Sequence, residues 1–175
     1  MRWIAASLAL LLPLAAGAAE PASDQPFLDR AQSMQEGLVD VAALAQHKGG
    51  ESVRLLGEHM QREHRAALER LHALAAKDDL MLPNVLQDPE VQLFKRLDSL
   101  GGRAFDEAYL SSLAEREADL VALYTDEAQG GKTRDVRAYA AAELPRMRAI
   151  AANVRAMAAG RTPRSQGSGD APAPW

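Results

Sequence analysis

Apolar residues recur along most of this chain at alternating intervals of four and three, and this spacing leaves few folds open. The first run of this kind consists of Phe27, Ala31, Met34, Leu38, Val41 and Ala45. An α-helix turns once in about 3.6 residues, so the spacing places all six side chains on one stripe of a helix. A stripe of this kind is the buried seam of a left-handed helix bundle.

Three further seams follow, and glycine pairs at 49–50, 101–102 and 130–131 separate the helices that carry them. The second seam contains Val53, Gly57, Met60, His64, Ala67, Leu71 and Leu74. The third contains Phe105, Tyr109, Leu113, Glu117, Leu120 and Tyr124, and the fourth contains Val136, Ala140, Glu143, Met147, Ile150, Val154 and Met157. No segment alternates as a strand does, so the sequence predicts an all-α bundle of four long helices.

The segment between the second and third long helices is unusually long and carries its own helix signal. Asp88, Pro89 and Glu90 are typical of a helix start, and they predict a short extra helix that ends at Gly101. A long crossover at this point is the ferritin-like arrangement of a four-helix bundle. A weak similarity between the segments from Asp40 and from Asp119 leaves two interpretations open, two related hairpins or chance similarity between amphipathic helices.

The chain start predicts export. Arg2 precedes an apolar stretch and then small residues up to Ala19, which is the layout of a secretory signal peptide over residues 1–19. We therefore expect cleavage near Ala19 and a periplasmic or secreted protein, with an uncleaved N-terminal anchor as the alternative. The remaining chain divides into a leader (20–26), a helical bundle domain (27–159) and a tail (160–175) that is rich in Gly, Pro and Ser and is expected to be disordered.

The composition excludes several functions. The chain has no cysteine, which rules out thiolate catalysis, thiolate zinc sites and iron–sulfur clusters. Its formal net charge of −4 argues against nucleic acid as a partner, because proteins that bind nucleic acid need a basic face. After the signal peptide, no segment is apolar enough to span a membrane.

His64 is the most informative polar residue, because it lies on a seam between Met60 and Ala67. A buried imidazole needs a hydrogen-bonding partner, and the seam residues Glu117 and Glu143 are the candidates. One interpretation is a core histidine bonded to a carboxylate, and the other is a mononuclear divalent metal site. A symmetric di-iron site is excluded, because the long helices after residue 104 contain no histidine. Off the seam, a surface position in solvent is expected for His72, Arg62, Arg65, Glu69 and Arg70.

Three sequence motifs together resemble an exported bacterial family, the domain-of-unknown-function 4142 family, whose members are often labelled outer-membrane proteins. The motifs are VRLLGEHMQREH on the second helix, FDEAYLSSLAE on the fourth and AYAAAELPRMR on the fifth, and the resemblance covers about residues 27–158. It implies a ferritin-like four-helix fold.

The resemblance also implies a set of polar positions, of which this chain keeps the acid–histidine pair as Glu63 and His64. An acid on the first helix is replaced by Leu38, and two histidines are replaced by Glu117 and Ile150. The metal-ligand candidates are therefore His64, Glu63 and Glu117.

The sequence favours a non-enzymatic exported bundle with a structural, stress-related or interaction role in the bacterial envelope. No catalytic or cofactor-binding residue stands out, no cofactor is expected, and no partner is identified beyond a loose association with the envelope. The alternatives are a ferritin-like metal-binding protein or oxidoreductase with a degenerate site, and a carrier that holds a small ligand inside the bundle.

Overall fold

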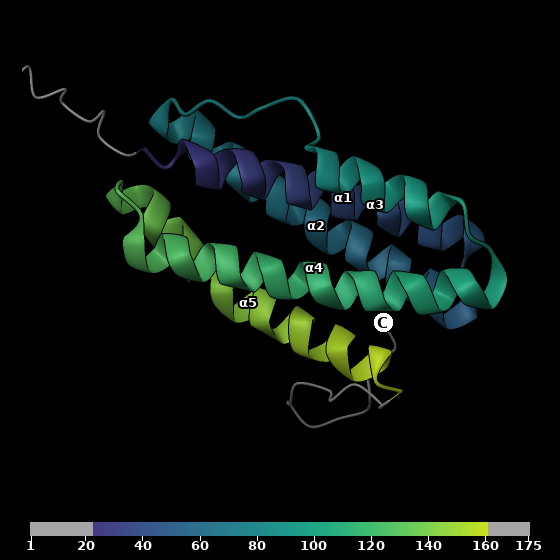
Figure 1. Ribbon diagram of the computed structural model, residues 1–175. Coiled ribbons are helices and arrows are strands. Elements are labelled where there is room, and N and C mark those ends of the chain that lie inside the picture. Colours follow the sequence, from purple (N-terminus) through teal and green to yellow (C-terminus); the bar gives the residue numbers. More distant parts are fainter. Residues whose placement is uncertain (1–22, 161–175) are drawn as a thin grey trace, which may run out of the picture.

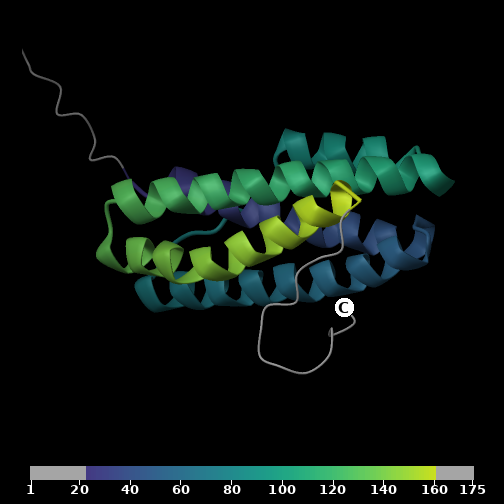
Figure 2. The same cartoon turned by 90° about the horizontal axis from the view of Figure 1, so that it is seen from below.

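The computed structural model describes residues 23–160, which are all-α and contain no strand. Helices α1 (Gln25–Lys48) and α2 (Glu51–Asp78) form one hairpin, and α4 (Gly102–Gly130) and α5 (Arg134–Ala158) form a second, as Figure 1 shows. Figure 2 shows α5 lying between α4 and α2. The predicted signal peptide (1–19), the first residues of the leader and the tail beyond residue 160 lie outside the described residues.

The predicted seams form the core. All six seam residues of α1 and all seven of α2 are buried, as are the six of α4. On α5 the seam is buried except for Ile150 and Met157, which are partly exposed near the carboxyl end of the helix. The pattern therefore identified the inner face of every long helix, because burial of one apolar stripe is what stabilises a helix in a bundle.

The crossover and its short helix complete the bundle. Residues 79–101 return along the length of the molecule, so that α2 and α4 run in the same direction (Figure 1). Helix α3 (Asp88–Asp98) packs on α1 and α4. Gly37 permits the close approach of α3, because a Cβ atom there would lie 2.5 Å from the Cγ atom of Glu90. The residue before this helix is Gln87, one position earlier than the predicted cap at Asp88.

Within residues 23–160, no helix combines the length and the apolar character needed to cross a bilayer. The long helices instead carry polar and charged residues on their outer faces, which is the pattern of helices that bury only one side.

Hydrogen bonds of Asp24 connect the start of α1 to the turn between α4 and α5. Its carboxylate oxygens accept hydrogen bonds from the backbone N–H groups of Lys132 and Thr133, at 2.6 and 2.7 Å. Burial acts to raise the pKa of Asp24, but the hydrogen bonds from Thr133 and Lys132 outweigh it and lower that pKa. Glu127 lies beside this carboxylate, and burial together with the charge of Asp24 raises the pKa of Glu127 to about 7.

We expect this pair to make the protein less stable as the pH rises through neutrality. The pKa of Glu127 is raised above its ordinary value of 4.5, so its contribution is fully present below pH 4.5 and is lost as the pH passes about 7. Lys132 and Arg137 oppose the shift and do not cancel it. Urea denaturation between pH 5 and pH 8 should show the decline, and Glu127→Gln, which stays neutral, should flatten it. A wild-type stability that increases over this range would contradict the expectation.

Candidate functional site

Three helices each place one buried polar side chain at the same level of the bundle. Gln35 comes from α1, His64 from α2 and Glu117 from α4, and their exposed fractions are 1, 3 and 1%. Burying a polar group costs free energy unless it finds a partner, so three such groups together indicate a polar centre rather than isolated defects.

The imidazole of His64 is held from both sides. Its Nδ1 atom lies 2.7 Å from Oε1 of Gln35, and its Nε2 atom lies 3.0 Å from Oε1 of Glu117. The contact with Glu117 has the distance of an ion pair but not the alignment of a hydrogen bond. Of the two carboxylate partners that the sequence offered, Glu117 is the one that faces His64. Glu143, the other candidate, bonds to Arg70 instead.

The contacts of Gln35 determine the direction of its hydrogen bond with His64. Gln35 also contacts the hydroxyl of Tyr124, and with Oε1 turned to His64 its amide nitrogen is the group left for that hydroxyl. His64 therefore donates Nδ1–H to Gln35. The Nε2 atom of His64 then faces Oε1 of Glu117 at 3.0 Å.

Three tyrosines extend the polar centre. Burial, followed by the contribution of Glu117, raises the pKa of Tyr109, whose hydroxyl is buried and has no hydrogen-bond partner among the described residues. Burial also raises the pKa of Tyr124 to about 12, and its hydroxyl lies 3.5 Å from that of Tyr139. All three phenols are therefore neutral at physiological pH.

A small cavity adjoins the histidine and lies between α2 and α5. Its volume is about 10 Å³, which is room for about one water molecule. The titratable side chains that line it are Glu63, His64, Arg70, Glu117, Glu143 and Arg146. The structure thus brings all three predicted metal-ligand candidates to one cavity.

The carboxylates at this cavity already have cationic partners. Oε2 of Glu63 lies 2.6 Å from both Nε and Nη2 of Arg146. Arg70 donates two hydrogen bonds to Glu143, at 2.6 and 2.8 Å. The prediction that Arg70 lies in solvent is wrong, since its long side chain reaches α5 from the border of the buried face.

The residues do not fit a metal centre in this arrangement. Tight sites need about three or more protein ligands aimed at one point. Within residues 23–160, no group of three or more histidine, aspartate and glutamate residues is arranged to hold a metal ion. His64 and Glu117 face each other directly, while Glu63 is turned to Arg146. Ile150 and Leu38 are apolar and supply no ligand.

The other described histidines do not line this cavity, although His59 interacts electrostatically with Glu63. His72 is exposed, as predicted, and its Nε2 atom lies 3.1 Å from Oε1 of Gln32. His59 lines a separate and mainly apolar cavity between α2 and α5.

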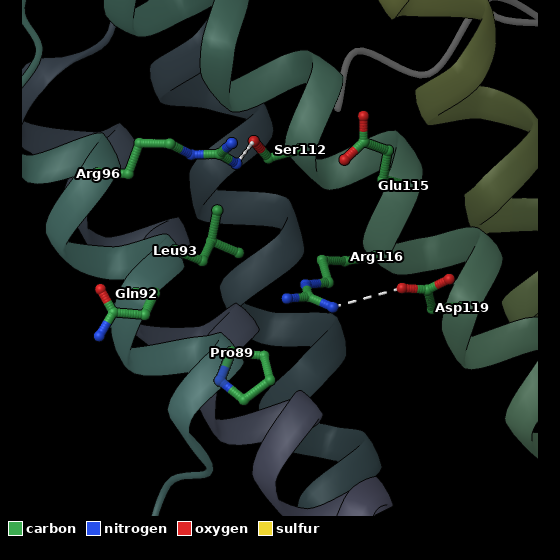
Figure 3. Close-up of a pocket in the computed structure, with 8 residues that line it drawn as sticks. All are labelled: Pro89, Gln92, Leu93, Arg96, Ser112, Glu115, Arg116 and Asp119. Carbon is green, nitrogen blue, oxygen red and sulfur yellow. Dashed lines mark hydrogen bonds and ion pairs between the residues drawn. The ribbon is translucent and has the colours of Figure 1, made fainter.

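A larger surface pocket of about 330 Å³ lies between α3 and α4, and Figure 3 shows its lining. Arg96 donates a hydrogen bond to the hydroxyl of Ser112, which in turn donates to the carbonyl of Ala108. Arg116 bonds to Asp119 at 3.3 Å on the same wall. The one buried polar residue here, Ser112, is therefore fully used and offers nothing to a ligand.

The sequence did not identify Gln35, Arg70 or Arg146 as residues of the polar centre and its cavity. Gln35 follows the seam residue Met34 and reads as a flanking position, but α1 is covered by α2, α3 and α4, so its buried face is wide. Gln32 and Ser33 are buried beside it, and no pattern within α1 indicates this.

Comparison with known proteins gives one kind of match. A family model described as "Domain of unknown function (DUF4142)" matches residues 11–157. No curated protein and no solved structure matches the chain.

Proposed function

The chain belongs to the DUF4142 family, and from this premise we propose that it is an exported, non-enzymatic protein of the bacterial envelope with a structural, stress-related or interaction role. We propose further that its bundle is ferritin-like. Two hairpins joined by a long crossover between the second and third bundle helices support that assignment. The signal-peptide layout of residues 1–19 supports export.

One observation carries the non-enzymatic role: the polar groups at the centre of the bundle are paired with one another. Glu117 contacts His64, Glu63 contacts Arg146, and Glu143 is bonded to Arg70. The cavity between them has room for about one water molecule, whereas sites for small-molecule ligands usually occupy about 300–1,000 Å³. A substrate or carried ligand in this central cavity would have to displace these pairs.

The second candidate function is a metal-binding protein or oxidoreductase with a degenerate site. It is favoured by a specific observation, which is that His64, Glu63 and Glu117 line the same cavity. The pairing of Glu63 with Arg146 counts against it, because that carboxylate would have to leave its partner to reach an ion.

Divalent metal ions should leave the melting temperature of the wild-type protein unchanged. A ligand present at 100 times its dissociation constant stabilises the folded state by about 2.7 kcal/mol. For a chain of this size that is a shift of roughly 5–10 °C, so real binding cannot escape detection. The measurement is a thermal melt with Mn²⁺, Fe²⁺ or Zn²⁺ against EDTA, together with metal analysis of protein purified from the periplasm.

One result would favour the metal-binding function over the structural one. If the wild type melts higher with one of these ions, and His64→Ala and Glu117→Ala both lose the response while His72→Ala keeps it, the metal-binding function replaces the structural one.

A further inference from the structure

Ion pairs connect α2 and α5, and their members on α2 are evenly spaced along that helix. Glu63, Arg70 and Lys77 are spaced by seven residues on α2 and so lie on one stripe of that helix. Their partners on α5 are Arg146, Glu143 and Asp135, in the order expected for antiparallel helices. These two helices approach each other less closely than the helices within either hairpin. Ion pairs therefore contribute to the contact between α2 and α5 along this stretch.

The two inner pairs close the cavity beside His64. The side chains of Glu63 and Glu143 are 17 and 9% exposed, while those of Arg146 and Arg70 are 51 and 36% exposed. The carboxylates thus face inward and the guanidinium groups cover them from the solvent side.

The charges around the cavity balance only with the arginines present. Three carboxylates line it, from Glu63, Glu117 and Glu143, and Glu117 faces the imidazole of His64. The other two would be a concentrated negative charge beside a buried polar group, which is costly without a partner. Arg70 and Arg146 supply two positive charges, the same charge that one divalent ion would bring.

We propose that Arg70 and Arg146 are built-in counter-cations of this centre, and that they keep divalent metal ions out of a potential four-ligand set of Glu63, His64, Glu117 and Glu143. This inference rests on the proposed non-metal function. According to this inference, the two arginines prevent a metal site from forming, although enough ligand atoms are present.

The geometry fits arginine in particular. Arg70 forms two parallel hydrogen bonds to Glu143, and the fork of a guanidinium matches a carboxylate in a way that a lysine ammonium does not. The hydrogen bond to Glu143, aided by the charge of that carboxylate, raises the pKa of Arg70 against the opposing effect of burial. Burial acts to raise the pKa of Glu63, but the hydrogen bond from Arg146 outweighs it and lowers that pKa.

Removing both arginines should create a metal site. The double variant Arg70→Gln/Arg146→Gln leaves all four potential ligands around one small cavity and frees Glu63 and Glu143 from their guanidinium partners. We expect it to bind Zn²⁺ or Mn²⁺ at least about 100-fold more tightly than the wild type, enough to raise its melting temperature clearly. Adding His64→Gln to the double variant should abolish that gain.

The matched control is Arg148→Gln/Arg155→Gln. Both arginines are exposed on α5, and neither has an ion-pair partner among the described residues. This variant loses the same two positive charges away from the cavity, so an equal gain in metal binding there would overturn the proposal. A folded Arg70→Gln/Arg146→Gln protein that does not respond to either ion would also overturn it.

A single variant keeps the test decisive if the double variant does not fold. Arg146 is half exposed, so Arg146→Gln should fold, and it frees Glu63 to join His64 and Glu117. It should show a smaller gain in Zn²⁺ affinity, and no gain would overturn the inference. Failure of the proposed function looks different, because the wild type itself would then respond to the ion.

Discussion

His64→Ala should lower the free energy of unfolding by about 3–5 kcal/mol, a large share of the stability of a domain this size. The substitution leaves Glu117, which is 1% exposed, without the imidazole whose Nε2 atom lies 3.0 Å from its Oε1. It also leaves Oε1 of Gln35 without its donor. An uncompensated buried charge costs far more than the lost packing of one imidazole. Urea denaturation followed by circular dichroism measures the difference.

His72→Ala is the matched control, because it removes the same side chain from the same helix. His72 is exposed and contacts only Gln32 through its ring, so its loss should cost less than about 0.5 kcal/mol. The double variant His64→Leu/Glu117→Leu should recover part of the loss, since it removes both members of the pair. Equal effects of His64→Ala and His72→Ala would show that the buried pair is not a stability determinant.

Gly57→Leu should destabilise the protein by about 3 kcal/mol, even though leucine is the better helix former. A Cβ atom at Gly57 would lie 2.8 Å from the carbonyl oxygen of Ala42 and 3.3 Å from the backbone nitrogen of Gln46. Both are main-chain atoms of α1, which cannot move without separating the two helices. Gly57 therefore sets the spacing of the first hairpin.

The comparison of two alanine substitutions isolates this effect. At Gly130, in the last turn of α4, an added Cβ meets no atom within 4 Å. Gly130→Ala should thus be neutral or stabilising, by up to about 1 kcal/mol from helix propensity. Gly57→Ala should destabilise despite the same propensity gain. If thermal melts show both variants stabilised, the close approach of α1 and α2 is not limiting.

The polar centre explains how a bundle of this length keeps charged residues in its interior. Its inner groups form a closed set: His64 with Glu117 and Gln35, Arg70 with Glu143, and Arg146 with Glu63. Such a set adds little net stability over an apolar core, yet removing one member is costly. It therefore fixes how α1, α2, α4 and α5 sit at this level.

The sequence alone predicted most of the fold, because helix periodicity identifies the stripe that each helix must bury. The four seams, the glycine pairs between the helices and the short helix after residue 87 all follow from local chemistry. The same reasoning placed His64 on a buried seam and offered Glu117 and Glu143 as its partners, and the structure brings Glu117 to it.

What periodicity leaves open is the rotation and axial register of one helix against another, and these were decided by tertiary packing. Gln35 is buried because three helices cover α1, which no pattern within α1 reveals. Arg70 was predicted to lie in solvent, but the register of α2 on α5 puts it opposite Glu143, so that Glu143 is not left for His64. The sequence determined which faces are inside; only the packed helices decided which charges meet there, because that depends on distances between residues 73 positions apart in the chain.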